Sequence, residues 1–265
     1  TLYENCCFNM LYRSALGLVK LDEQRPSIDS YYTLRRNMTK YQEETGVDLF
    51  DKCFKGITRK QALEYHISGK AVRMGSKLIS SNIAWFSRYE IIHETLMQQV
   101  SKSEIESIED QLIRQQALDF YEENAQKTVY RTDSETMEKR LLTLGIVIDY
   151  ILTHLPEDSK PLLSRVFNEQ YDKAEDGTVT VRDKKLVSAK SVQNPNDPDA
   201  HYRSKAGKKA KGFSTNITET CDEENKPNLI TDVEVKGATT ADNTYVESGV
   251  KDTEDVTGNK VDTLY

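Results

Sequence analysis

The densest group of basic residues in this sequence lies just after residue 200. Its members are Arg203, Lys205, Lys208, Lys209 and Lys211. Lysine and arginine at this density can neutralise phosphates and release their counterions, which gives affinity for a nucleic-acid backbone without sequence preference. The alternative is a basic loop that is solvated and binds no ligand. The residues alone favour the solvated loop.

A second group that could do chemistry is a pair of carboxylates. Asp232 and Glu234 lie two residues apart in a predicted strand, so they share one of its faces. Carboxylate oxygens are ligands that Mg²⁺ prefers. We nevertheless expect these two side chains to be solvated or hydrogen-bonded at a sheet edge.

Histidine and cysteine offer no recognisable ligand pattern. The histidines are His66, His93, His154 and His201, and the cysteines are Cys6, Cys7, Cys53 and Cys221. Neither set has the spacing of a zinc site or of a disulfide framework. We therefore expect no bound metal, a reducing environment and a cytoplasmic location.

Composition limits the remaining classes. A chain of 265 residues can form one large domain or two ordinary ones. Its apolar runs fall short of the roughly 20 residues that a membrane-spanning helix needs, so we expect no membrane partner. The net charge of −7 disfavours nucleic acid as a partner of the whole surface, but local patches count for more than the sum.

The elements that must position these groups begin with a helical segment, residues 1–66. Ser27 is a good helix start, and the apolar side chains that follow have helical spacing. Arg35 and Arg36 lie on the opposite side of the same predicted helix. A small bundle with a solvated basic face would look the same.

The rest of the chain alternates between strand and helix patterns. Residues 70–79 read as a short strand that contains Gly75, and two more strands, 213–221 and 229–235, read as an antiparallel hairpin. Between them lie amphipathic helices, the first of which we expect to begin at Asn82. This predicts a helical insertion at about 83–170 and a linker at about 172–200.

Three stretches resemble the transposases of bacterial insertion sequences that use a DDE active site. They are SIDSYYTLRRNM, from residue 27; SGKAVRMGSKLISSNIAWFSRYEIIHETL, from residue 68; and NPNDPDA with the basic block after it, from residue 194. The resemblance runs from about Phe8 to Tyr265 and is most specific over 68–95 and 194–235. It implies a helix-rich α+β fold. An N-terminal helical DNA-binding domain, 1–66, would precede a partial RNase H-like domain, 67–265, that holds the helical insertion.

The resemblance also implies a function, DNA transposition with Mg²⁺. DNA would be the partner, either as element ends or as nonspecific duplex, and a homo-oligomer is left open. The DNA contacts would come from Arg35, Arg36, Arg203, Lys205, Lys208, Lys209 and Lys211. Gly75 stands where the family has its first catalytic Asp, and the second would follow Tyr265. We therefore expect a catalytically inactive fragment that holds no Mg²⁺ itself.

A different class of function fits the same composition. The acidic balance and the long amphipathic helices are typical of a helical protein-interaction module without a DNA role. Binding to nonspecific duplex DNA, measured over a range of salt concentrations, separates this hypothesis from the first.

Overall fold

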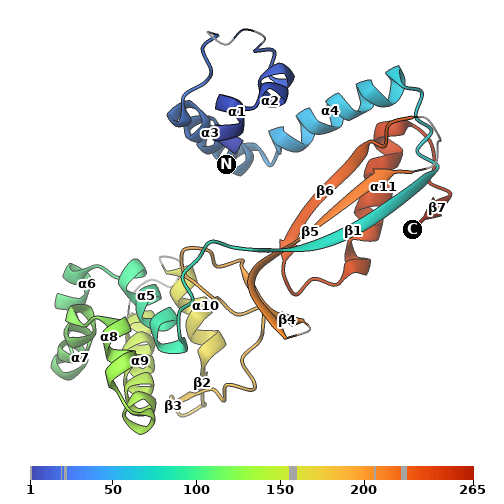
Figure 1. Ribbon diagram of the computed structural model, residues 1–265. Helices are drawn as coiled ribbons and strands as arrows, with labels where there is room; N and C mark the ends of the chain where they lie inside the picture. The colour runs from blue at the N-terminus through green and yellow to red at the C-terminus, as the bar shows by residue number, and fades with distance from the viewer. Residues whose placement is uncertain (1, 19, 21–22, 155–159, 206, 222–225) are drawn as a thin grey trace. The chain divides into compact units, whose positions relative to one another are not determined.

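The chain folds into an α+β structure with two compact units. The computed structural model describes residues 2–18, 20, 23–154, 160–205, 207–221 and 226–265 (Figure 1). Unit 1 comprises Thr1–Val72, Glu219–Thr231 and Lys251–Tyr265, and unit 2 comprises Arg73–Thr218 and Asp232–Val250. Each unit is therefore built from segments that are distant in sequence.

The N-terminal part of unit 1 is helical, as predicted. It contains α1 (Leu2–Phe8), α2 (Met10–Ala15), α3 (Ile28–Thr45) and α4 (Leu49–Glu64). The side chain of Ser27 accepts a hydrogen bond from Ser30 N and starts α3, while Gly46, with a φ of 71°, ends it in the left-handed conformation. Asp48 caps α4 in the same way as Ser27 caps α3.

Helix α4 packs on the C-terminal half of α11 (Val246–Thr257), also in unit 1. Lys55 pairs with Asp252 at 2.9 Å, and Arg59 pairs with Asp255 at 2.8 Å. Beside these ion pairs lies a small buried cluster that consists of Ala62, Ile67, Leu229 and Val256. Unit 1 therefore takes its core from both ends of the chain.

The sheet is mixed. Its strands are β1 (Ala71–Ser80), β4 (His201–Lys205), β5 (Lys208–Thr220), β6 (Ile230–Gly237) and β7 (Thr263–Leu264). The order is β4–β5–β1–β7, with β6 also paired to β5; β4 and β5 are antiparallel, whereas β1 and β7 are parallel. Gly75 lies in β1, next to β5. The predicted strand and its position beside the 213–235 hairpin are thus confirmed.

One face of these strands is covered by the segment after β6. In unit 2, Tyr245 of η2 (Asp242–Tyr245) donates its hydroxyl hydrogen to Ser214 O at 2.9 Å, and Ser248 of α11 donates to Glu234 at 2.7 Å. The opposite face carries exposed β-branched side chains. Ile217 of β5 and Val233 and Val235 of β6 are among them.

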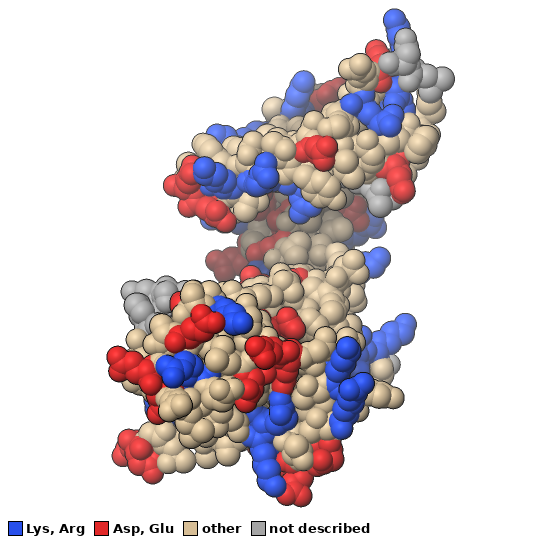
Figure 2. All heavy atoms as spheres, turned by 90° about the vertical axis from the view of Figure 1, so that its left-hand side faces the viewer, with Lys and Arg blue, Asp and Glu red and all other residues tan. Residues whose placement is uncertain are grey.

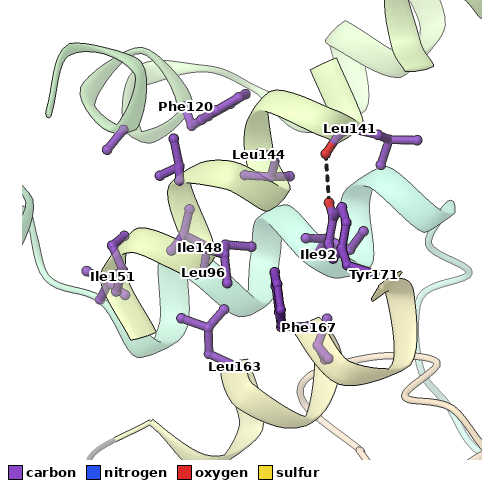
Figure 3. Close-up of a cluster of buried hydrophobic side chains, with 14 of the residues drawn as sticks. Ile92, Leu96, Phe120, Leu141, Leu144, Ile148, Ile151, Leu163, Phe167 and Tyr171 are labelled. Carbon is purple, nitrogen blue, oxygen red and sulfur yellow. Dashed lines mark hydrogen bonds between the residues drawn. The ribbon is translucent and has the colours of Figure 1, made fainter. Parts of the chain in front are cut away.

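The helical part of unit 2 contains the largest core. Its elements are α5 (Arg88–Gln99), α6 (Lys102–Glu106), α7 (Gln111–Glu122), α8 (Ala125–Arg131), α9 (Ser134–His154) and α10 (Pro161–Gln170), followed by β2 (Tyr171–Lys173) and β3 (Val179–Val181). Figure 3 shows the side chains of α5, α9 and α10 interdigitating, with Leu96, Leu144 and Leu163 fully buried. The predicted helical character of 83–170 is confirmed.

The predicted start of the first of these helices at Asn82 was wrong. Helix α5 begins at Arg88, because Ser87 and Glu90 form a reciprocal capping box. Residues 82–86 have no helical hydrogen bonding and are held from outside, by the segment around Asn194. Asn194 donates its side-chain amide hydrogen to Ala84 O at 3.2 Å.

Helix α9 approaches β2 closely at a glycine. A Cβ at Gly145 would lie 2.4 Å from the ring of Tyr171. That ring is buried, is stacked on Phe167 and donates its hydroxyl hydrogen to Leu141 O at 2.8 Å (Figure 3). The absence of a side chain at 145 therefore sets the distance between the helix and the strand.

Candidate nucleic-acid interface

The basic cluster lies on a pair of strands and not in an irregular loop. We call residues 201–212 of β4 and β5 the basic hairpin. Its register pairs Arg203 with Ala210, Ser204 with Lys209, and Lys205 with Lys208, and its turn contains Gly207 with a φ of 77°. The register predicts which basic residues share a face, because residues paired across two strands point to the same side.

The hairpin divides its basic residues between two faces. Arg203 and Lys208 belong to one face, and Lys209 and Lys211 belong to the other. Lys208 and Lys209 are both exposed, whereas Arg203 is half-buried and donates a hydrogen bond to Ala238 O at 3.0 Å. The side chain of Lys205 lies outside the described part of the structure. The register therefore does not place all five cations on one phosphate-binding face.

Lys211 points into the protein. It is 6% exposed, and its ammonium donates to Phe86 O at 3.3 Å and lies 5.1 Å from the centre of the Trp85 ring. Burial lowers its pKa, while Glu90 acts in the opposite direction. In this conformation the group cannot reach a phosphate, so among the side chains of the hairpin that the structure describes the exposed cations are Lys208 and Lys209.

Arg35 and Arg36 lie on α3, in the other compact unit. Both side chains are exposed, and the guanidinium of Arg35 lies 5.7 Å from the centre of the Tyr31 ring. They form a separate basic site on the N-terminal helices. Arg35 and Arg36 can be tested separately from the hairpin.

The position of Gly75 offers space but no metal ligands. Gly75 is exposed, and a Cβ built on it would have no atom within 4 Å. Asp232 is buried, and Glu234 is held by Lys236 at 2.9 Å and by Ser248 at 2.7 Å. Among the described residues, no group of three or more His, Cys, Asp or Glu side chains could hold a metal ion. Gly75 itself supplies no oxygen ligand for the Mg²⁺ that the resemblance implies for the family.

The two most specific stretches of the resemblance lie side by side. Ser81 donates a hydrogen bond to Asp197, Ser81 N donates to Lys211 O at 2.9 Å, and Gln98 donates to Asn196 at 3.1 Å. The segment from residue 194 therefore fixes the connection between β1 and α5. Its polar residues are explained by this structural role.

Two buried ionic contacts were missed in the sequence. The ammonium of Lys160 is 2.8 Å from Glu104 Oε1 and 2.8 Å from Gln99 O, and Glu123 accepts from both Tyr89 and Arg140. Lys160 holds the pKa of Glu104 well below its ordinary value, at about 2. Both contacts join helices, and no pattern in the sequence indicates which of its many Lys and Glu residues would meet.

The face drawn in Figure 2 shows no large region of one sign. On the face drawn in Figure 2, Lys and Arg are interspersed with Asp and Glu, and neither covers it. Within the part of the chain that the structure describes, no helix is long and apolar enough to cross a membrane. Comparisons with protein-family models, with curated proteins and with solved structures each give no significant match.

Proposed function

We propose that the chain binds duplex DNA without sequence preference and belongs to the lineage of insertion-sequence transposases with an RNase H-like domain. The main observation in its favour is the basic hairpin. Lys208 and Lys209 project from opposite faces of its tip, and the hairpin is continuous with the strand that neighbours Gly75. The two paired strands fix the backbone from which these side chains extend, so binding does not have to order the backbone as well.

The same proposal assigns no strand cleavage to the chain. Cleavage of the DDE type needs carboxylates that hold two metal ions. Gly75 supplies no oxygen, and the carboxylate of Glu234 in β6 is engaged with Lys236 and Ser248. What is left is a fold that presents cations to DNA.

The test is binding of a fluorescein-labelled duplex by anisotropy, over a range of salt concentrations. We expect Lys208→Ala with Lys209→Ala to weaken binding and to reduce the slope of log K against log salt by about 0.9 for each phosphate that is no longer neutralised. Lys251→Ala with Lys260→Ala removes the same charge from exposed positions of unit 1 and serves as the control. Equal slopes for the two double variants, or no binding at low salt, would refute the proposal.

A second candidate function rests on the N-terminal helices. Helix α3 has no buried residue, and α4 exposes Phe50 and Ile57 on the side away from Lys55 and Arg59. These apolar side chains favour a protein-interaction module, with a second copy of the chain as the partner. Sedimentation at increasing concentration tests it: Phe50→Glu with Ile57→Glu should abolish any self-association, and a monomer at all concentrations would exclude it.

A further inference from the structure

The helical part of unit 2 contains a groove whose surface is partly apolar, unlike that of the basic hairpin. It has a volume of about 850 Å³ and lies beside α8, the start of α9 and the segment after β3. Val129, Met137, Leu141 and Val181 contribute its apolar surface. This volume lies within the roughly 300–1,000 Å³ that is usual for sites of small organic ligands.

The groove is also cationic. Arg88, Arg182, Lys184 and Lys185 line it, against the two acidic side chains of Glu138 and Asp183. An anion is therefore the ligand with complementary charge. The positive end of α9 adds little to this, because the carboxylate of Asp133 already accepts from Thr136 N there.

The two arginines are fixed by the protein. Arg182 is 3.0 Å from Asp172 and donates to Asn168 O at 2.9 Å, while Arg88 donates to Gln170 Oε1 at 2.8 Å and, from its second donor, to Gln170 O at 2.6 Å. Burial lowers the pKa of Arg88, and the charge of Arg182 lowers it further. Asp172 also lies 2.5 Å from Nη2 of Arg182 and offsets its charge, so the charge left for an anion is that of Arg88 and the two lysines.

The two lysines are the adaptable part of the site. Lys184 and Lys185 follow β3 and are exposed, and within the described chain neither is paired with a carboxylate. Each ammonium can turn toward a ligand, since its stem is flexible and its three donors have no fixed plane. The groove thus combines two fixed guanidiniums, two mobile ammoniums and an aliphatic floor.

We propose that this groove binds a nucleotide, with the phosphate at Lys184, Lys185 and Arg88 and the base on the aliphatic floor. The thioether of Met137 is suited to contact with an aromatic base. Thr132, Ser134 and Glu138 also line the groove and could hydrogen-bond to the edge of the base. The nucleotide is either free or part of a nucleic-acid strand, because both present the same phosphate and base. The site does not depend on the basic hairpin.

Isothermal titration calorimetry tests the site with three ligands: dAMP, inorganic pyrophosphate and a short single-stranded oligonucleotide. We expect dAMP to bind, and Lys184→Ala with Lys185→Ala to weaken it by about tenfold or more, since the variant loses charge-assisted hydrogen bonds to the phosphate. Lys251→Ala with Lys260→Ala is the charge-matched control, and Lys208→Ala with Lys209→Ala separates this site from the hairpin. Both should bind dAMP like the wild type.

The arms of the experiment distinguish the sources of the ligand. The ligand is a nucleic-acid strand if the oligonucleotide binds more tightly than dAMP and this binding is lost in the Lys184→Ala, Lys185→Ala variant. The ligand is a free nucleotide if the two affinities are equal. Three results would overturn the proposal: no dAMP binding at millimolar concentration, unchanged affinity in the double variant, or preference for a glutamate-rich peptide. Pyrophosphate that binds as tightly as dAMP would overturn the role of the aliphatic floor.

Discussion

Replacing Gly145 with alanine should destabilise unit 2, although alanine is the better helix former. The new Cβ would lie 2.4, 2.7 and 2.9 Å from three atoms of the Tyr171 ring, and contact distances between carbon atoms are about 3.5–4.0 Å. The ring must therefore move by about 1 Å. Its stacking on Phe167 and its 2.8 Å hydrogen bond to Leu141 O oppose that movement (Figure 3).

The magnitude follows from three contributions. Overpacking of a core costs about 1–3 kcal/mol, and loss of the Tyr171 hydrogen bond adds about 1 kcal/mol. The helix propensity of alanine returns up to about 1 kcal/mol relative to glycine. We expect a net loss of about 2 kcal/mol in the free energy of unfolding. This corresponds to a fall of about 1 M in the urea midpoint if the slope is about 2 kcal/mol per molar.

The assay is urea unfolding followed by fluorescence of Trp85, the single tryptophan of the chain, which lies in unit 2. Gly56→Ala is the matched control, because Gly56 is also helical and a Cβ there meets nothing within 4 Å. We expect that variant to leave the Trp85 transition in place. An unchanged or higher midpoint for Gly145→Ala would show that the packing of Tyr171 against α9 is not rigid.

Three further predictions concern charged positions. The pKa of Glu104 is lowered from 4.5 to about 2, mainly by Lys160, so the stabilisation that its carboxylate provides is complete above pH 4.5 and is lost as pH falls through 2. In urea titrations, Glu104→Gln should therefore reduce the change in unfolding free energy between these pH values by about 1 to 2 kcal/mol, after allowance for the partial exposure of the carboxylate. A variant with the acid dependence of the wild type would contradict this prediction. Gly75→Asp should have a urea midpoint close to that of the wild type, since a Cβ there meets open space. The variant should still fail to nick supercoiled plasmid with Mg²⁺, and nicking would show that other residues supply the metal ligands. Lys211→Met should leave duplex affinity unchanged, because this ammonium faces Trp85, and a loss as large as that caused by Lys209→Ala would place Lys211 at the interface.

Much of the fold could be predicted from local patterns. The strand patterns of 70–79, 213–221 and 229–235 indicated β1, β5 and β6, and amphipathic periods indicated the helices of 83–170. The start of α5 could not be placed, because Asn82 and Ser87 are both good caps. The choice between them depends on Asn194, more than 100 residues later.

The candidate site was predicted less well, for a physical reason. Composition identifies a cluster of cations but not the direction in which each points. Lys209 and Lys211 share a face of β5, yet one is exposed and the other is buried against Trp85, which comes from a distant part of the sequence. The adjacent Lys184 and Lys185 lie in the stretch that was predicted to be a linker, and the other residues that line the groove come together only in the folded chain.

Unit 1 contains segments from both ends of the chain, so it cannot complete its folding until synthesis is nearly finished. Arg59 and its partner Asp255 are separated by 196 residues. At about 5–20 residues per second, synthesis takes roughly 10 to 40 s to deliver the second after the first. During this interval α4 has none of its partners on α11, and Ala62 and Ile67, which pack with Leu229 and Val256 in the folded chain, face solvent or a chaperone. The N-terminal helices are thus the first part of unit 1 to be synthesised and the last to gain their packing, which makes the nascent chain most prone to aggregation before Asp255 leaves the ribosome.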